Sequence, residues 1–259
     1  MKIGLTLLVR DEVDIIKQWL NFHIPKVDFI VVTDNGSCDG TREILESYSD
    51  AIHIIDEPKQ DYQQDKWVNR MIKVCTGYGC EWVANSDSDE FWHCDFHGLA
   101  KSAPSNVGSI AVRCRLFVPT VKDDQSINDP IKRMKYYTPA GRNTKERECI
   151  SVWHKVMHRT EGFKGIELGN HKAHFVDRRM GKKVERGDNF IAHYPNRSWE
   201  QFRFKIINGG ESYTRSNLPK DYGWHWREKY ETYYRGGTTA LKRLWYNEID
   251  HNTERLTKI

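Results

Sequence analysis

The stretch that decides the fold is CEWVANSDSDEFW, residues 80–92. An apolar run at residues 82–84 ends at three acids within four positions, Asp87, Asp89 and Glu90. The apolar run favours a strand inside a sheet, but the acids behind it need a physical reason, because a buried carboxylate is costly unless it is paired. Three explanations are available: a solvated turn, a calcium loop, or a site that holds a metal ion against phosphate groups.

The calcium loop fails on its pattern. An EF-hand loop needs an oxygen ligand at its fifth position and glycine at its sixth, whereas this chain has Phe91 and Trp92 there. A solvated turn explains any single Asp at this place. It explains the cluster less well when the neighbouring strand ends are considered with it.

Near-continuous apolar runs alternate with helical spacing along the first third of the chain. Predicted strands cover residues 2–9, 29–33, 51–55 and 81–85, and predicted helices cover residues 11–22, 41–48 and 63–74. The helix over 11–22 has acids in its first turn, where the helix dipole favours negative charge. Continuous apolar runs are typical of strands buried on both faces, and a helix between successive strands implies a parallel sheet. The sequence therefore predicts an α/β fold.

Charged and polar side chains directly follow three of these predicted strands. They are RDE at residues 10–12, DNG at residues 34–36 and DSD at residues 87–89. Because parallel strands end at the same edge of a sheet, and ligands bind beyond that edge, these groups should meet in one site.

The pattern changes after about residue 95. Residues 108–120 alternate between apolar and polar, as in a strand with one solvated face, and residues 151–160 are predicted to be its antiparallel partner. Residues 121–148 are polar and rich in turn formers, which indicates a mobile loop or lid. From Ser198 onward the pattern is helical and the tail is aromatic and basic.

Composition excludes several protein classes. The chain has 259 residues, 38% of them hydrophobic and 12% aromatic, and no apolar run approaches the roughly 18 residues of a spanning helix. A net charge of +4 suits a ligand with phosphate groups but is too weak to indicate nucleic acid. Six scattered cysteines without a CxxC pair favour reduced thiols. We expect a cytoplasmic protein without a transmembrane segment.

An Asp-x-Asp directly after a strand has a specific chemical use. One carboxylate can reach a divalent ion while the other orients water or a ribose hydroxyl, and hard oxygen ligands suit Mg²⁺ or Mn²⁺. Together with LLVRDEVDIIKQWLNFH, IVVTDNGSCDGT and HYPNRSWEQFRFKIINGG, the stretch WVANSDSDEFW resembles the family 2-like glycosyltransferases of the GT-A fold. The resemblance covers about the first 95 residues and resumes near residues 150–210.

The resemblance implies a metal-dependent transferase that moves a sugar from a nucleotide diphosphate sugar to an acceptor hydroxyl, usually with inversion. It implies a GT-A domain with a nucleotide-sugar-binding half (residues 1–95), a more antiparallel acceptor-side half (96–210) and a helical C-terminal extension (211–259). Uridine diphosphate is the default donor nucleotide, and the acceptor is a glycan, a lipid-linked sugar or a protein.

Carried over by position, the resemblance assigns roles to named residues of this chain. Arg10 and Glu12 would line the nucleotide pocket, Asp34 would bind the base, and Asp87 and Asp89 would be the DxD pair at the ribose and the metal. Basic side chains near the base, diphosphate or acceptor would be Lys66, His193, Arg197 and Lys205.

One family feature is missing from the sequence. Many family 2 enzymes have an acidic ED pair whose Asp is the catalytic base, and this chain has none. The nearest substitutes lie in GIELGNHKAHF, with Glu167 as the base and His171 as an additional metal ligand. His193 is the rival candidate for the base.

Two other functions remain open at this point. A nucleotidyltransferase also uses acids and Mg²⁺, and a non-catalytic protein could bind carbohydrate or nucleotide. A nicotinamide-dependent oxidoreductase is disfavoured, because the first strand runs into VRDEVD and not into a Gly-x-Gly-x-x-Gly turn.

Overall fold

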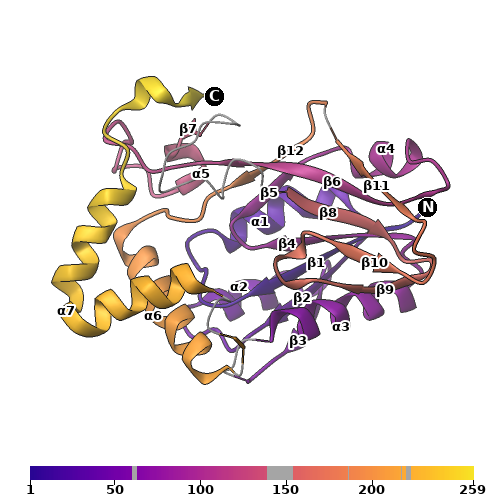
Figure 1. Ribbon diagram of the computed structural model, residues 1–259, viewed down its shortest axis with the longest axis horizontal. Helices are drawn as coiled ribbons and strands as arrows, with labels where there is room; N and C mark the ends of the chain where they lie inside the picture. The colour runs from indigo at the N-terminus through magenta and orange to yellow at the C-terminus, as the bar shows by residue number, and fades with distance from the viewer. Residues whose placement is uncertain (60–62, 139–153, 186, 217, 220–222) are drawn as a thin grey trace. The chain divides into compact units, whose positions relative to one another are not determined.

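The computed structural model describes residues 1–259 except 60–62, 139–153, 186, 217 and 220–222 (Figure 1). The chain divides into two compact units. The first comprises residues 1–58, 64–115 and 140–193, and the second comprises residues 59–63, 116–139 and 194–259. The division expected from the sequence, after residues 95 and 210, remains a prediction.

A mixed sheet forms the centre of the first unit (Figure 1). Its parallel part has the order β3 (His53–Asp56), β2 (Phe29–Asp34), β1 (Ile3–Val9) and β4 (Trp82–Asp87). Beyond β4 the order continues through β8 (His154–Arg159), β6 (Val107–Leu116), β12 (Phe190–His193) and β5 (Glu90–His93). The short strand β11 (Gly181–Val184) pairs with β6. The predicted α/β fold, parallel at first and more antiparallel later, is confirmed.

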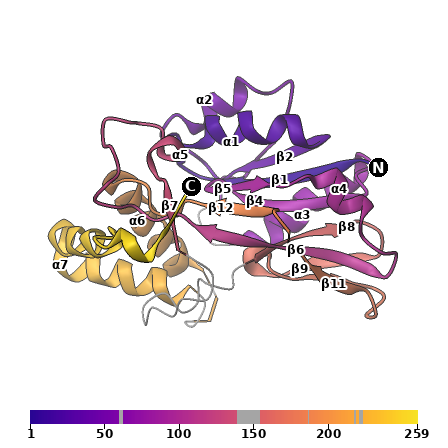
Figure 2. The same cartoon turned by 90° about the horizontal axis from the view of Figure 1, so that it is seen from above.

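Helices cover both faces of the parallel strands. Figure 2 shows α1 (Ile16–His23) and α2 (Thr41–Glu46) on one side, and α3 (Gln64–Gly77) on the other. Right-handed crossovers require this arrangement, because the chain moves outward from β1 to β3 and then returns across the sheet to β4. The α3 face buries Val68, Met71 and Ile72 against Val31 and Val83 of the sheet. The short helix α4 (Phe96–Lys101) follows β5.

The first helix begins later than the sequence predicted. It starts at Ile16 and has no acid in its first turn, so the expected helix over residues 11–22 with acids at its beginning was wrong at that end. The reason lies in hydrogen bonds from a distant loop: the amide of Glu12 donates to Thr41 Oγ1 (2.8 Å) and that of Val13 to Asp39 Oδ2 (3.0 Å). Asp11 takes a left-handed conformation with φ 53°, which a helix cannot include.

The antiparallel pair of strands that the sequence predicted after residue 95 forms as expected. Strand β8 pairs with β6 in antiparallel register, with Met157 opposite Ile110. The expected solvated face of the first strand is wrong for residues 108–112, because all five are buried. The hairpin of β9 (Phe163–Ile166) and β10 (Ala173–Phe175) explains part of this, since the Phe175 ring fills the space beside Gly108.

The second unit is mainly helical. Its core joins α6 (Trp199–Arg215) to α7 (Trp224–Glu248) through Phe202, Ile206, Leu241 and Trp245. Residues 116–138 contribute α5 (Pro130–Arg133) and β7 (Tyr136–Tyr137), and β7 pairs with β13 (Thr257–Lys258). The two C-terminal helices agree with the predicted helical tail. None of the helices in the described ranges has the length and apolar composition needed to cross a membrane.

Parts of three expectations lie outside the described residues. They are residues 139–148 of the expected loop or lid, residues 151–153 of the expected strand, and Cys149.

A buried histidine joins α1 to β5. The Nδ1–H of His23 donates to the Trp19 carbonyl oxygen (2.9 Å), and its Nε2 accepts the amide of Trp92 (3.2 Å). The neutral ring with its proton on Nδ1 therefore makes a hydrogen bond with each nitrogen. A second proton on Nε2 would point at the amide N–H of Trp92. Burial lowers the pKa of His23 to about 3.

We predict that His23 makes the fold sensitive to acid. The unfolded chain takes up a proton below pH 6.5 while the folded chain does not, so stability falls as the pH falls from 6.5 toward 3. Between pH 6.5 and 5 the free energy of unfolding should drop by about 2 kcal/mol through this residue. Urea unfolding at several pH values measures the slope. His23→Gln should make the slope shallower, leaving the part that comes from other buried histidines such as His158, and the exposed His251→Gln should not change it. An unchanged slope in His23→Gln would contradict the prediction.

Candidate functional site

The polar strand ends meet at one edge of the sheet, as predicted. The register places Val9 opposite Asp34 and Leu8 opposite Asp87. The loops after β1, β2 and β4 therefore begin side by side. From the antiparallel part, β12 ends at the same place, because His193 pairs with Glu90.

Side chains from the β2 loop hold the β1 loop. Asp11 donates its amide to Ser37 Oγ (3.1 Å) and accepts the Cys38 amide on Oδ1 (2.8 Å). Thr41 Oγ1 accepts the Glu12 amide and donates to Asp39 Oδ1 (2.6 Å). Because these bonds join side chains to backbone across the two strands, Arg10 and Glu12 are carried on a fixed loop.

Asp34 is buried at the end of β2. Its Oδ1 accepts both the amide (3.0 Å) and the hydroxyl (2.6 Å) of Ser37, and Arg42 lies 3.6 Å from its Oδ2. The carboxylate thus closes a turn within its own loop. Closing this turn is a structural role for Asp34, and it is compatible with the expected role of Asp34 in binding the base.

Asp87 and Glu90 share a buried lysine. The Nζ of Lys155, from β8, lies 2.7 Å from Asp87 Oδ2 and 3.1 Å from Glu90 Oε1. Burial by itself would lower the pKa of Lys155, but the charges of Asp87 and Glu90 outweigh it and raise that pKa, so the lysine stays charged. Burial, together with the charges of Asp87 and Asp89, raises the pKa of Glu90 to about 7 against the opposing effects of Lys155 and His193.

Asp89 lies next to His193. The His193 Nε2 is 3.5 Å from Asp89 Oδ1, and the two side chains are only 10% and 5% exposed. The structure thus brings together three of the predicted site residues, Asp87, Asp89 and His193, at the ends of β4 and β12.

His171 lies near this cluster, but its ring contacts residues of its own loop and of β8. Its Nδ1–H donates to the His154 carbonyl oxygen (2.6 Å), and its Nε2 packs over Gly169. Gly169 has φ 79°, and a Cβ there would come within 2.7 Å of that nitrogen. Burial lowers the pKa of His171, which keeps the ring neutral.

Glu167 lies in the β9–β10 hairpin. It is 51% exposed and pairs with His174 Nε2 at 2.7 Å and Lys172 Nζ at 3.5 Å. Burial would raise its pKa, but the hydrogen bond from His174 and the charge of Lys172 lower it overall. A carboxylate whose pKa is lowered and which already pairs with a histidine and a lysine is a poor proton acceptor at neutral pH.

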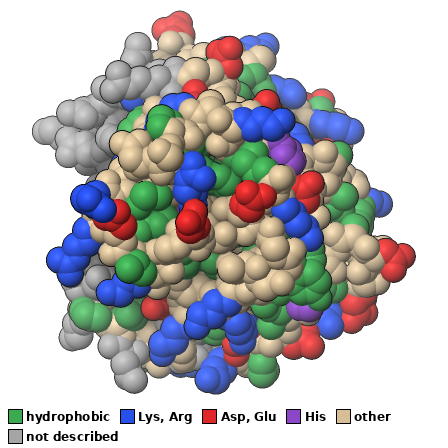
Figure 3. All heavy atoms as spheres, turned by 90° about the vertical axis from the view of Figure 1, so that its right-hand side faces the viewer, with side chains coloured by type: hydrophobic (Ala, Val, Ile, Leu, Met, Phe, Trp, Pro, Cys, Tyr) green, Lys and Arg blue, Asp and Glu red, His purple; other side chains and the backbone are tan. Residues whose placement is uncertain are grey.

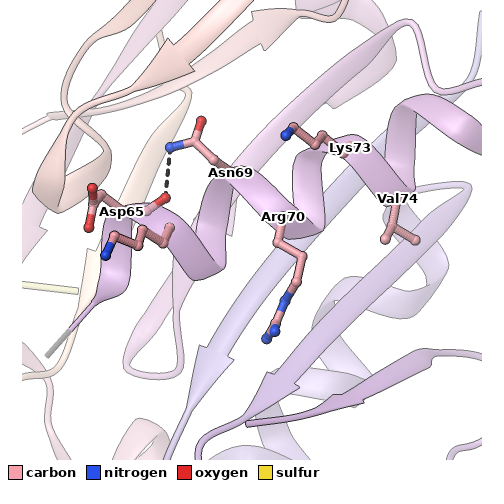
Figure 4. A pocket seen from close by; sticks show the side chains of 6 residues that line it. Asp65, Asn69, Arg70, Lys73 and Val74 are labelled. Carbon is pink, nitrogen blue, oxygen red and sulfur yellow. Dashed lines mark hydrogen bonds between the residues drawn. The ribbon is translucent and has the colours of Figure 1, made fainter. Parts of the chain in front are cut away.

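The remaining expected basic residues lie elsewhere in the two units. Lys66 lies on α3 and lines an open cavity of about 580 Å³. The other residues that line this cavity, Asp65, Asn69, Arg70, Lys73 and Val74, belong to the same helix (Figure 4). Arg197 and Lys205 belong to the second unit, where they donate to the carbonyl oxygens of Tyr194 (3.1 Å) and Pro195 (3.3 Å). On the face shown in Figure 3, acidic and basic side chains are interspersed, which agrees with the small net charge.

A sequence profile described as Glycosyl transferase family 2 matches residues 14–164, more than half of the chain. The chain belongs to glycosyltransferase family 2. The resemblance drawn from the motifs is thereby confirmed, and with it the expectation of a nucleotide-sugar-dependent glycosyltransferase.

Solved structures similar to this family 2 glycosyltransferase share little sequence with it. S. aureus TarS 1–349 in complex with UDP is 13% identical, with a TM-score of 0.48 over 90% of this chain and 72% of that chain. A longer S. aureus TarS structure is 14% identical, with a TM-score of 0.45 over 92% of this chain and 44% of that chain.

Glucosyl-3-phosphoglycerate synthase from Mycobacterium tuberculosis, in complex with Mn²⁺, UDP and glucosyl-3-phosphoglycerate, is 13% identical, with a TM-score of 0.33 over 44% of each chain. No curated protein sequence matches the chain. The identification therefore depends on the family profile.

The carboxylate oxygens at the sheet edge of this glycosyltransferase are the type of ligand that a hard divalent cation prefers. Asp87 and Asp89 supply carboxylates, and Mg²⁺ at phosphate sites is commonly held by one or two carboxylates plus substrate oxygens. Within the described residues, no group of three or more His, Cys, Asp or Glu side chains is arranged to hold a metal ion. A metal ion held by these two carboxylates would complete its coordination shell with other oxygens, such as those of water or of a bound diphosphate.

Sequence reasoning assigned no role to three contributors to this site. Glu90 accepts the Asp87 amide on Oε2 (3.1 Å), Gln64 donates to Asp87 Oδ1 (3.3 Å), and Lys155 bridges the two acids. In the sequence Lys155 is one of several basic residues in a short strand, HKVMHR, and nothing local sets it apart from them. That pattern does not reveal which neighbouring strand supplies its partner.

We predict that the Thr41 hydroxyl stabilises the loop that carries Arg10 and Glu12. Thr41→Ala leaves the buried Glu12 amide without its acceptor and should lower the free energy of unfolding by about 1–3 kcal/mol. Thr41→Ser keeps the hydroxyl and is the matched control. Urea unfolding measures the difference, and the KM for the donor should rise in the Ala variant alone. Equal stability of the two variants would show that this bond has no effect.

Proposed function

We propose that this enzyme transfers a sugar from a nucleoside diphosphate sugar to an acceptor hydroxyl by a direct displacement that inverts the anomeric carbon. The observation that carries the proposal is the meeting of Asp87, Asp89 and His193 at the edge where β1 and β2 also end. A glycan, a lipid-linked sugar or a protein would supply the hydroxyl.

The donor nucleotide would lie over the ends of β1, β2 and β4. Arg10 and Glu12 lie on the loop that the β2 segment holds, and Asp34 lies beside it. We assign these three residues to the nucleoside and Asp87 to the ribose. Uridine diphosphate is the first nucleotide to test because family 2 enzymes use it most, followed by guanosine and thymidine diphosphates. Lys66, Arg197 and Lys205 are proposed to neutralise phosphate or to contact the acceptor.

Mn²⁺ or Mg²⁺ would be held by Asp89 and Asp87, together with oxygens of the donor diphosphate. When bound, such an ion neutralises charge on the departing diphosphate. His171 remains a proposed additional ligand through Nε2. The chain's own contribution is the placement of two carboxylates on short, hydrogen-bonded turns at the sheet edge.

His193 is the better supported candidate for the base that takes the acceptor proton. His193 ends β12 at the sheet edge, and Asp89 Oδ1 lies 3.5 Å from its Nε2, where the carboxylate can orient the imidazole ring. Glu167, the alternative, is exposed and already paired with His174 and Lys172. In a direct displacement, a single base is needed to take the proton of the hydroxyl that attacks the sugar.

We predict that Asp89→Asn lowers donor turnover by about 100-fold or more, because stabilisation of the leaving diphosphate is worth several kcal/mol. The test is a hydrolysis screen of UDP-, GDP- and TDP-sugars with Mn²⁺, with Mg²⁺ and with EDTA. EDTA should have the same effect as Asp89→Asn, and the exposed Asp188→Asn is the control. Full turnover in EDTA and in Asp89→Asn would overturn the proposed metal site.

We predict that the two candidate bases separate by mutation. His193→Asn should lower kcat by about 10²- to 10⁴-fold, the usual effect of losing a general base. Glu167→Gln should leave kcat close to wild type. Transfer to acceptor is measured once a donor is known, and NMR of the product gives the anomeric configuration. A severe loss in Glu167→Gln with a mild one in His193→Asn would reverse the assignment.

A further inference from the structure

Lys155 is buried inside the sheet beside the acid cluster. Its strand, β8, lies between β4 and β6, with Lys155 opposite Val112 of β6. The side chain is only 4% exposed. A lysine so placed is tolerated only when its charge is paired, and its burial keeps it from touching a bound ligand directly.

One Lys–Glu pair holds Asp87 from two directions. Lys155 Nζ contacts Asp87 Oδ2 at 2.7 Å, and Glu90, which contacts the same lysine, accepts the Asp87 backbone amide at 3.1 Å. The other carboxylate oxygen, Oδ1, accepts Gln64 Nε2 at 3.3 Å. The Asp87 side chain and its peptide group are thus both held, while the side chain remains 33% exposed.

We propose that Lys155 is a positioning residue for the donor: it holds the Asp87 carboxylate in the orientation that binds the nucleotide ribose. The inference depends on the proposed function, which assigns Asp87 to the ribose. Lys155 contributes a fixed ammonium behind the carboxylate, so that Asp87 does not need to be ordered when the nucleotide arrives.

The competing explanation is purely structural. Lys155 could serve only to neutralise Glu90, which is 1% exposed and would otherwise be an unpaired buried charge. The two explanations differ in one respect: if Lys155 acts only on Glu90, it becomes dispensable once Glu90 is neutral.

The test uses Glu90→Gln as the background. Lys155→Met alone leaves the acids without a counter-ion and is expected to fold poorly. In Glu90→Gln/Lys155→Met the buried pair is removed as a unit, and Asp87 keeps its solvent-facing side. Glu90→Gln/Lys164→Met, which removes an exposed lysine of β9, is the matched control. Thermal unfolding checks that each variant is folded.

The readouts are calorimetric binding of UDP, GDP and TDP with Mn²⁺, and the KM and kcat for the donor. We expect Glu90→Gln/Lys155→Met to bind the nucleotide at least tenfold more weakly than Glu90→Gln, with a matching rise in KM and a smaller change in kcat. Equal binding by these two variants would overturn the inference while leaving the proposed function intact. A wild-type protein that binds none of the three nucleotides would overturn both.

Discussion

The parallel pairing of β1 with β2 and β4 is the constraint on which the rest of the structure depends. It brings Val9 next to Asp34 and Leu8 next to Asp87, residues that are far apart in the sequence. Because all three strands point the same way, their loops leave from one edge, and the side chains in those loops can hydrogen-bond to one another. A strand that ran antiparallel here would deliver its loop to the opposite edge, and no site would form.

Gathering acids at one edge creates an electrostatic problem, which the antiparallel part of the sheet solves. Asp87, Asp89 and Glu90 come from one short stretch, and burial together with the charges of the two aspartates raises the pKa of Glu90. Lys155 from β8 and His193 from β12 bring the counter-charge and the polar partner. The later half of the first unit is therefore needed for the chemistry of the earlier half, as well as for its packing.

The site combines fixed parts with an exposed part. The β1 loop is held by Thr41 and Ser37, and Asp87 is held by Lys155 and Glu90, so these groups need little ordering when a ligand binds. Glu167, in contrast, lies on an exposed hairpin and is engaged with His174 and Lys172. This difference is why we propose a base at the end of β12 and not in the hairpin.

The sequence by itself determined the approximate positions of the first four strands, their parallel direction and the edge at which the polar groups meet, because apolar runs and helical spacing are local properties of the chain. It also identified the family through motifs at that edge. The order of the strands in the sheet came only from the structure. Tertiary structure alone decided where α1 begins, since the amides of Glu12 and Val13 bond to Thr41 and Asp39 in another loop. It alone decided that Lys155 lies behind Asp87, because pairing β8 with β4 joins strands separated by some seventy residues of sequence. A single lysine looks the same in a sequence whether it faces water or a buried carboxylate; only long-range packing distinguishes the two.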